Sequence, residues 1–315
     1  MKDVRTLPKA HLHTHLESTV RPGTIRDLGG EPAVQQRPFG SFREFGDARA
    51  EVRALLREPS HFRRIAEEFC ADEAAQGVGH VEVSFTAAAH GERLGDPEMP
   101  LAAVLEGLAA GAERYGISTA VILDHSRRRP VERLRSSLRL ALRHRPQVVA
   151  IGLAGDEAYP AEPFAEVCAE AQEAGVHLVH HAGEAAGPES VREVLTLGRA
   201  ERIGHGIRVL EDPDLVAELA ARRVPLEVCP TSNLLLGLVP SLAEHPLPRL
   251  LAAGLLVTLN TDGETALADE YRRARDHLGR TDADLAALAR ASVAASFAPA
   301  EVKAALLAGI DDWAR

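Results

Sequence analysis

Short apolar runs rich in Val, Ile and Leu recur along the 315-residue chain, separated by longer amphipathic segments dense in Ala, Leu, Glu and Arg. Runs of this length and composition are typical of strands in a parallel sheet that is buried on both faces. Eight such runs occur, and they span residues 10–16, 80–85, 118–124, 148–155, 177–183, 202–206, 225–230 and 255–262. The pattern therefore predicts eight buried strands.

The segments between these runs have helical periodicity. Residues 213–223 show it, and so do residues 130–145, where one helix face carries Val131, Leu134, Leu138 and Leu142. Strands and helices therefore alternate, which predicts an α/β fold. Eight parallel strands, each followed by a helix, favour a closed (β/α)8 barrel of the TIM type; an open doubly wound sheet is the main alternative.

The chain contains no internal repeat, low-complexity tract or charged block that would divide it. We therefore expect residues 1–315 to form a single domain. The longest connection, at about residues 20–79, follows the first predicted strand and contains helical patterns over residues 42–56 and 60–76. A helical insertion of this length at the mouth of a barrel is a candidate lid.

Composition narrows the class of protein. The chain is 45% hydrophobic and 26% charged with a formal net charge of -10, which suits a soluble protein and disfavours nucleic acid or an anionic membrane as partner. The three cysteines, Cys70, Cys168 and Cys229, lack the paired spacing of a zinc ribbon, so we expect a reduced, cytoplasmic setting. No segment approaches the ~20 apolar residues that span a bilayer, and residues 1–10 lack the apolar core of a signal peptide.

Candidate chemistry begins in the first predicted strand, where the sequence KAHLHTHLE covers residues 9–17. Alternate residues of a strand face the same way, so His11, His13 and His15 all point into the barrel. Only the carboxyl end of the strand reaches the face on which barrel enzymes build their sites. His13 and His15 are therefore candidate ligands and His11 lies deeper. Ordinary core histidines are the alternative, which the paired spacing disfavours.

Three other predicted strands end in residues of the same kind. The sequence HHAGE supplies His181 and Glu184, GHG supplies His205, and NTD supplies Asp262. Because the carboxyl ends of barrel strands converge, three imidazoles and a carboxylate would meet at one mouth, a set that suits Zn²⁺ with a position left for water. His180 faces the opposite side of its strand and is left unassigned.

In order, the motifs LHTHLE, LAGDE, HAGE, RIGHG, CPTSN and NTD resemble those of the adenosine deaminase family of the amidohydrolase superfamily, over nearly the whole chain. The resemblance implies one zinc ion per chain. The two-metal members of the superfamily carry a bridging lysine at the end of the fourth strand, where this chain has LAGDE. The implied zinc ligands are His13, His15, His181 and Asp262.

The resemblance also implies catalytic roles. Glu184 is the proton shuttle that donates to N1 of a 6-aminopurine, while Asp262 and His205 orient the attacking water and take up its proton. His205 also stabilises charge on the attacking oxygen. The alternative for Glu184 is a carboxylate that favours the start of the helix predicted to follow it. Its offset of three residues from His181 favours catalysis.

The substrate-binding residues implied by the resemblance are His15, Glu17 and Gly155. Glu17 stands where related nucleoside deaminases contact the ribose, and the Gly155 backbone contacts the purine N3 edge. Ser18 and Thr19 replace the Gly-containing stretch usual in the family.

A second departure follows the predicted metal ligand Asp262. The family normally has two consecutive aspartates after NT, and the second reads purine N7, whereas this chain has Gly263. Glu264 is one residue further along the turn and points in a different direction, although it is the one carboxylate nearby that can take over this contact. Recognition of the base therefore differs from that of the relatives.

These residues predict a zinc-dependent hydrolytic deaminase that acts on a 6-aminopurine nucleoside or a related adenine compound and releases ammonia. Its expected partner is a small-molecule purine nucleoside or analogue, and the sequence leaves the oligomeric state open. Three alternatives remain: a deaminase of the 6-aminodeoxyfutalosine type with altered base or 5′-group recognition, another metal hydrolase such as an amidase, and a non-catalytic nucleoside-binding protein.

Overall fold

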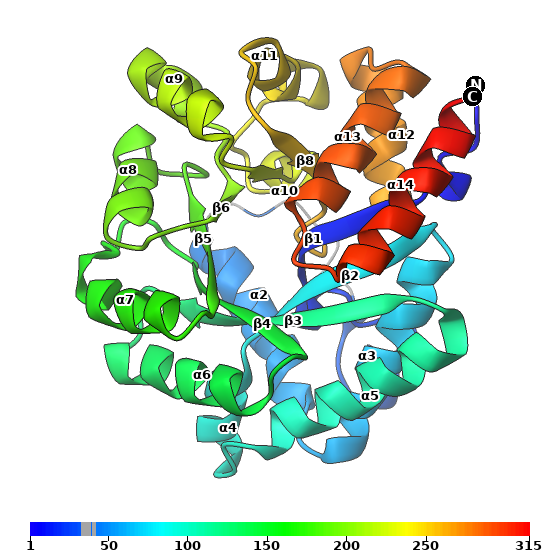
Figure 1. Ribbon diagram of the computed structural model, residues 1–315. Helices are drawn as coiled ribbons and strands as arrows, with labels where there is room; N and C mark the ends of the chain where they lie inside the picture. The colour runs from blue at the N-terminus through cyan, green and yellow to red at the C-terminus, as the bar shows by residue number, and fades with distance from the viewer. Residues whose placement is uncertain (33–38, 40–41) are drawn as a thin grey trace.

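In the computed structural model, which describes residues 1–32, 39 and 42–315, strands surround a central axis and helices lie outside them (Figure 1). All strand pairs are parallel, and the strands follow one another in chain order from β1 to β8. This arrangement confirms the predicted (β/α)8 barrel. The strands are β1 (Lys9–His15), β2 (Val78–Phe85), β3 (Ser118–Ser126), β4 (Val148–Ala154), β5 (His177–Ala182), β6 (Arg202–His205), β7 (Leu226–Val228) and β8 (Val257–Leu259).

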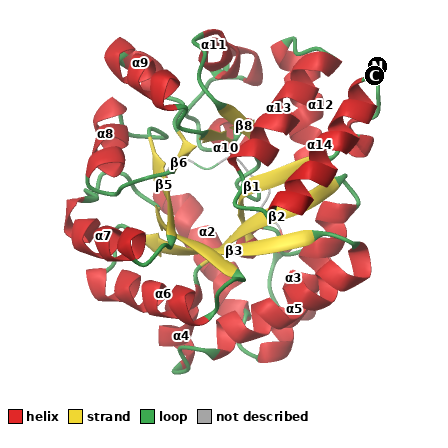
Figure 2. Ribbon diagram, viewed as in Figure 1, coloured by secondary structure: helices red, strands yellow, loops and turns green. Residues whose placement is uncertain are grey.

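Helices cover the outside of the strands, as the colouring of Figure 2 shows. The core lies between these two layers, where apolar strand residues such as Leu12, Val83 and Leu123 are fully buried. The helices are α1 (Pro22–Asp27), α2 (Phe42–Leu55), α3 (Pro59–Ala74), α4 (Ala87–Leu94), α5 (Met99–Tyr115), α6 (Val131–Arg143), α7 (Ala165–Glu173), α8 (Pro188–Thr196), α9 (Pro213–Arg222), α10 (Pro230–Leu235), α11 (Leu247–Ala252), α12 (Leu267–Leu278), α13 (Asp282–Ala295) and α14 (Ala300–Ala314).

The barrel closes between its first and last strands. The side-chain oxygen of Asn260, just after β8, accepts hydrogen bonds from the backbone N–H groups of Leu12 (2.9 Å) and His13 (3.1 Å) in β1. The backbone N–H of Asp262 donates to the carbonyl of His13 at 3.0 Å. Closure therefore brings the loop after β8 next to the histidines of β1.

Two element predictions need correction in detail. Strands β7 and β8 are shorter than the apolar runs that predicted them, because α10 begins at Pro230 and because Asp262 adopts a left-handed backbone conformation with φ of 60°. In α6, Leu142 is 42% exposed while Ala141 is buried. At 100° per residue the buried face is centred near Leu134 and Ala141, so Leu142 falls at its edge.

Helices α1, α2 and α3 occupy the long connection between β1 and β2. A buried ion pair joins Arg49 of α2 to Glu264 in the loop after β8. The backbone N–H of Phe39 donates to the carbonyl of Leu235 at the end of α10. The insertion is therefore attached to the carboxyl-terminal face of the barrel, where the candidate site lies. No helix within the described ranges is long and apolar enough to cross a membrane.

Candidate active site

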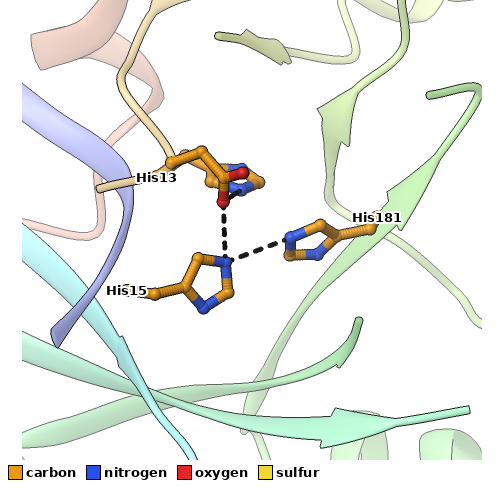
Figure 3. Close-up of side chains that lie close together, drawn as sticks. His13, His15 and His181 are labelled. Atoms are coloured by element: carbon orange, nitrogen blue, oxygen red, sulfur yellow. Dashed lines mark hydrogen bonds and ion pairs between the residues drawn. The ribbon is translucent and has the colours of Figure 1, made fainter. Parts of the chain in front are cut away.

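The four predicted metal ligands gather at the carboxyl ends of β1, β5 and β8. Each of them offers one ligating atom within 4.8 Å of the others. Three contacts define the cluster: His15 Nε2 lies 3.1 Å from Asp262 Oδ1 and 3.3 Å from His181 Nε2, and His13 Nε2 lies 3.4 Å from Asp262 Oδ1. Figure 3 shows the three imidazoles pointing toward a common centre. Residues far apart in the sequence therefore form one buried donor set.

Carboxylates outside the cluster orient the two β1 imidazoles. Nδ1 of His13 lies 3.0 Å from Glu227 Oε2, and Nδ1 of His15 lies 2.8 Å from Asp124 Oδ2. An ionised carboxylate can only accept a hydrogen bond, so Nδ1 of each imidazole carries the hydrogen. Nε2 of each imidazole therefore keeps its lone pair for a ligand at the centre of the cluster. Carboxylate–histidine pairs of this kind are the usual support of metal-ligating histidines.

The donor set fits a divalent metal. His13 Nε2 is buried and makes no hydrogen bond to any described residue, although burying an unpaired nitrogen is costly. Burial alone would lower the pKa of His13, but Asp262 and Glu227 outweigh it and raise that pKa to about 9. Burial opposes ionisation of Asp262 as well, yet its contacts with His13 and His15 hold its pKa well below the ordinary value. The ionised carboxylate of Asp262 therefore places a negative charge beside the imidazole nitrogens, which a bound cation would neutralise.

His11 and His180, the histidines set apart from the site by sequence, lie outside the cluster. Nδ1 of His11 is 2.8 Å from Glu73 Oε2, and its Nε2 is 3.1 Å from Thr261 Oγ1. Nδ1 of His180 accepts the backbone N–H of Leu153 at 2.9 Å. Both imidazoles are fully buried and have partners, so they serve as structural core histidines.

Glu184 and His205 face each other beside Asp262. Glu184 Oε1 lies 3.5 Å from His205 Nε2, and neither atom has a hydrogen-bond partner among the residues described. Burial, followed by the negative charges of Asp262 and Glu157, holds the pKa of Glu184 well above its usual range. Burial also lowers the pKa of His205, to about 3. Burial therefore favours the protonated form of Glu184 and the neutral form of His205.

The loop that carries Glu184 is held by Glu157. Its carboxylate accepts backbone N–H groups from Gly183 (2.7 Å), Glu184 (2.9 Å) and Ala185 (2.8 Å), and the hydroxyl of Ser190 (2.6 Å). Charge-assisted hydrogen bonds of this kind are stronger than neutral ones. Glu157 stands in the quoted LAGDE motif, but sequence reasoning gave it no role, because the loop it holds follows a different strand.

The short helix α10 supports two site residues at once. The hydroxyl of Ser232 donates to Asp262 Oδ2 at 2.6 Å, and the amide of Asn233 contacts Nδ1 of His205 at 3.3 Å. Both residues belong to the CPTSN motif. That motif was recognised without a function for either side chain, and the neighbouring polar residue His245 was missed entirely.

The residues expected to contact substrate occupy the same face. Gly155 lies just after β4 with a left-handed φ of 86°. Glu17 is buried, and its Oε1 accepts the backbone N–H of Thr86 (3.1 Å) and lies 3.2 Å from His90 Nε2. Burial opposes ionisation of Glu17, but His90 outweighs it and lowers the pKa to about 2. One oxygen of Glu17 is therefore committed to the protein and the carboxylate is ionised.

Gly263, which stands where the family has a second aspartate, packs against Ser18. Gly263 has a φ of 89°, and a Cβ added there would lie 2.5 Å from the Ser18 Cβ and 3.1 Å from the His15 carbonyl oxygen. A side chain at residue 263 therefore requires both left-handed strain and displacement of Ser18. Glu264 is drawn into the buried ion pair with Arg49. Ser18 and Gly263, which both differ from the family pattern, are therefore in contact and depend on each other.

The chain is similar to known proteins over nearly its whole length. The family model described as adenosine deaminase matches residues 8–313. A relative named putative adenosine/adenine deaminase, from Streptomyces coelicolor, is 36% identical over 99% of this chain and 98% of its own. The crystal structure of adenine deaminase from Arthrobacter aurescens superposes with a TM-score of 0.92 at 32% identity, covering 97% of this chain and 98% of that one.

A zinc-bound amidohydrolase structure from Burkhoderia ambifaria is also similar, with a TM-score of 0.89 and 27% identity over 99% of this chain and 92% of that one. The family model and the first relative each span nearly the whole sequence. This chain belongs to the adenosine deaminase family.

Proposed function

We propose that the protein catalyses the zinc-dependent hydrolytic deamination of a 6-aminopurine nucleoside or related adenine compound and releases ammonia. One observation carries the proposal: Glu184 and His205 lie within a few ångströms of the four-ligand cluster, in one buried site at the barrel mouth. Family membership supports deaminase chemistry, because relatives over the full length are named adenosine or adenine deaminases.

Three imidazole nitrogens and one carboxylate oxygen form a donor set that zinc prefers. The chain has three lysines, and each of them donates to a backbone carbonyl elsewhere: Lys2 to Trp313, Lys9 to Val4 and Lys303 to Ala294. The similar zinc-bound amidohydrolase supports this choice of metal. The residues that would hold it are His13, His15, His181 and Asp262, with one ion per chain. When bound, zinc supplies Lewis acidity that lowers the pKa of a water molecule to about 7.

The protein's own residues account for the proton transfers. Glu184, protonated because it is buried, donates its proton to N1 as the water oxygen bonds to C6. A proton from that water passes to Asp262 and then to the departing amine. The C6–N bond breaks, ammonia leaves, and the remaining hydroxyl proton returns to Glu184 as the carbonyl forms. The sum is amine plus water giving carbonyl plus ammonia.

Substrate contacts are proposed at three positions around this centre. The backbone of Gly155 faces the N3 edge of the base, and Glu17 lies beside the sugar. His15 contributes one wall of the site, with a side chain 17% exposed. Similar structures from Arabidopsis contain IMP and GMP, which supports a purine compound of small size as the partner.

An altered substrate is the second candidate. Gly263 supplies no side chain toward N7, and a Streptomyces coelicolor relative that is 36% identical over 98% of this chain is named aminodeoxyfutalosine deaminase. We therefore propose that a 5′-extended adenine nucleoside is used better than adenosine. The test compares kcat/KM for adenosine, adenine, 7-deazaadenosine and a 5′-extended adenine nucleoside. A strong preference for adenosine with rejection of the 7-deaza compound contradicts this candidate.

The setting proposed for this activity is the cytoplasm, with residues 1–315 acting as one domain. Cys70, Cys168 and Cys229 are all free and buried, which supports a reducing compartment. A net charge of -10 disfavours nucleic acid as a partner.

The first experiment measures metal and ammonia together on the purified protein. Elemental analysis is expected to give about one zinc per chain, and a 6-aminopurine substrate is expected to release ammonia. Chelation should abolish ammonia release, and added zinc should restore it. Two tightly held metals per chain, or full activity without metal, contradicts the proposed centre.

A further inference from the structure

Behind His205 lies a polar chain that the proposed mechanism does not use. The amide nitrogen of Asn233 contacts His205 Nδ1 at 3.3 Å, and the amide oxygen of Asn233 contacts Nε2 of His245 at 3.1 Å. Nδ1 of His245 accepts the backbone N–H of Leu247 at 3.1 Å. His205 and Asn233 are fully buried and His245 is 3% exposed. The groups therefore bond to one another with little access for water.

The chain has a fixed direction because it starts at a group that can only donate. A backbone N–H has no lone pair, so Nδ1 of His245 must be the acceptor and its hydrogen must sit on Nε2. Of the two ends of the Asn233 amide, the carbonyl oxygen is the one that can accept a hydrogen bond from this Nε2–H. The other end of the Asn233 side chain is then an NH₂ group, which donates to Nδ1 of His205.

The consequence falls on the catalytic face of His205. With Nδ1 occupied as an acceptor, the single hydrogen of the neutral imidazole is on Nε2. Nε2 is the atom that points to the site, 3.5 Å from Glu184 Oε1 and without a hydrogen-bond partner in the described part of the chain. A nitrogen that already bears hydrogen donates a hydrogen bond and does not take up a proton.

We propose that His245, acting through Asn233, is a positioning residue that fixes His205 as the Nε2–H tautomer. In that form His205 donates a hydrogen bond to the oxygen that attacks C6, and the proton of the attacking water goes to Asp262. This keeps the expected role of His205 in stabilising the attacking oxygen and assigns the proton uptake, which was expected of both residues, to Asp262 alone. The inference rests on the proposed hydrolytic function, although the tautomer itself is independent of it.

The direct test observes the tautomer by NMR of protein labelled with ¹⁵N-histidine, metal-free and zinc-loaded. The His205 signals are assigned by their loss in His205→Gln. The expected spectrum has a hydrogen-bearing Nε2 and a bare Nδ1. Hydrogen on Nδ1 in the parent protein overturns the proposal, whether or not the protein proves to be a deaminase.

Two variants test the relay by kinetics. Asn233→Asp replaces the donor to His205 with an acceptor and reverses the tautomer; kcat is expected to fall roughly 10²-fold or more with KM within a few-fold, because wrong-tautomer variants of other enzymes lose orders of magnitude in kcat. His245→Leu removes the donor to Asn233 and should lower kcat by about tenfold. An unchanged kcat in Asn233→Asp contradicts the relay.

The matched control is His245→Gln, whose side-chain NH₂ group can donate to Asn233 in place of the imidazole. It is expected to recover most of the kcat lost in His245→Leu and to return the His205 signals to the parent positions. Equal losses in the Gln and Leu variants, with folding unchanged by circular dichroism, overturn the role of His245. If the parent releases no ammonia from any 6-aminopurine, the proposed function fails while the NMR experiment still decides the tautomer.

Discussion

The carboxyl group of Glu184 must keep its proton at neutral pH if it is to donate to a ring nitrogen. Burial and the nearby negative charges of Asp262 and Glu157 favour that protonated form. We predict that Glu184→Gln retains about one zinc per chain and lowers kcat by roughly 10²-fold or more, as expected for the loss of a proton-transfer group. Steady-state ammonia release together with elemental analysis checks both parts. Parent-like turnover in this variant would remove Glu184 from the mechanism.

Gly263 and Ser18 form a second residue-scale test, because a Cβ at residue 263 would lie 2.5 Å from the Ser18 Cβ. A non-glycine residue in the left-handed region costs ~1–2 kcal/mol, and the overlap adds to this. Gly263→Asp is therefore expected to lower the free energy of unfolding by about 2 kcal/mol or more.

Adding Ser18→Gly to Gly263→Asp removes the Cβ with which the new side chain overlaps. The double variant should therefore regain on the order of 1 kcal/mol of unfolding free energy, since contacting residues couple by this amount. Urea unfolding of the parent, both single variants and the double variant measures the coupling. Additive losses would show that Ser18 does not enforce the glycine.

The ligands and their supporting residues differ in how visible they are in a sequence. His13 and His15 stand two residues apart at a strand end, and strand alternation is enough to place them on one face. Glu227 lies in β7 and Asn233 in α10, and no local period marks either residue. Their roles depend on hydrogen bonds 3.0–3.3 Å long that only the folded barrel creates.

At the scale of elements, apolar runs were sufficient to find all eight strands, because the strand positions that pack against the surrounding helices are apolar. Their ends were less visible. The run that predicted β7 continues past Val228 to the start of α10. The run that predicted β8 continues past Leu259 into the turn at Asp262. Chain direction changes there for reasons of local backbone geometry, which composition does not record.

The loop from β5 to α8 illustrates how one element depends on another. Glu157, after β4, accepts the N–H groups of Gly183, Glu184 and Ala185. Glu157→Gln puts an NH₂ group against some of these donors and removes the charge. We predict a loss of about 1–3 kcal/mol in the free energy of unfolding, with a lower kcat because Glu184 is less well held.

The matched control for this loop is Glu162→Gln, a nearby exposed glutamate, which should change the unfolding free energy by less than ~0.5 kcal/mol. Thermal and urea unfolding measure both variants, and ammonia release measures kcat. Equal stability of Glu157→Gln and the parent would show that backbone geometry alone holds the loop.

Across the whole molecule, a buried network links His13, one of the proposed metal ligands, to the floor of the barrel. His13 contacts Glu227, whose other oxygen accepts from Arg202 at 2.6 Å, and Arg202 also donates to Glu82 at 2.6 Å. All four side chains are almost inaccessible to solvent. Four strands, β1, β2, β6 and β7, are thereby joined through one guanidinium.

This network makes stability depend on pH. Burial disfavours the Glu82 carboxylate, but the charge of Arg202 outweighs it and lowers the pKa from 4.5 to about 2. A folded pKa below the unfolded one adds stability that is fully present above pH ~4.5 and is lost as the pH falls toward 2. The shift corresponds to roughly 3 kcal/mol.

We predict that Glu82→Gln is less stable than the parent by about 3–5 kcal/mol at pH 7, because it leaves the buried Arg202 without one of its two carboxylates. The difference between the two proteins should narrow as the pH falls below ~4.5, since the unfolded parent then protonates Glu82 while the folded parent still keeps it ionised. Urea unfolding at pH 7, 5, 4 and 3 measures the gap, and using the difference cancels every other titrating group that the two proteins share. A gap that stays constant from pH 7 to 3 would mean that Glu82 has the same pKa in the folded and the unfolded protein, so that Arg202 does not favour its ionised form. A gap that widens as the pH falls would mean that Glu82 is already protonated in the folded barrel, and the charge balance around Arg202 would then rest on Glu227 alone.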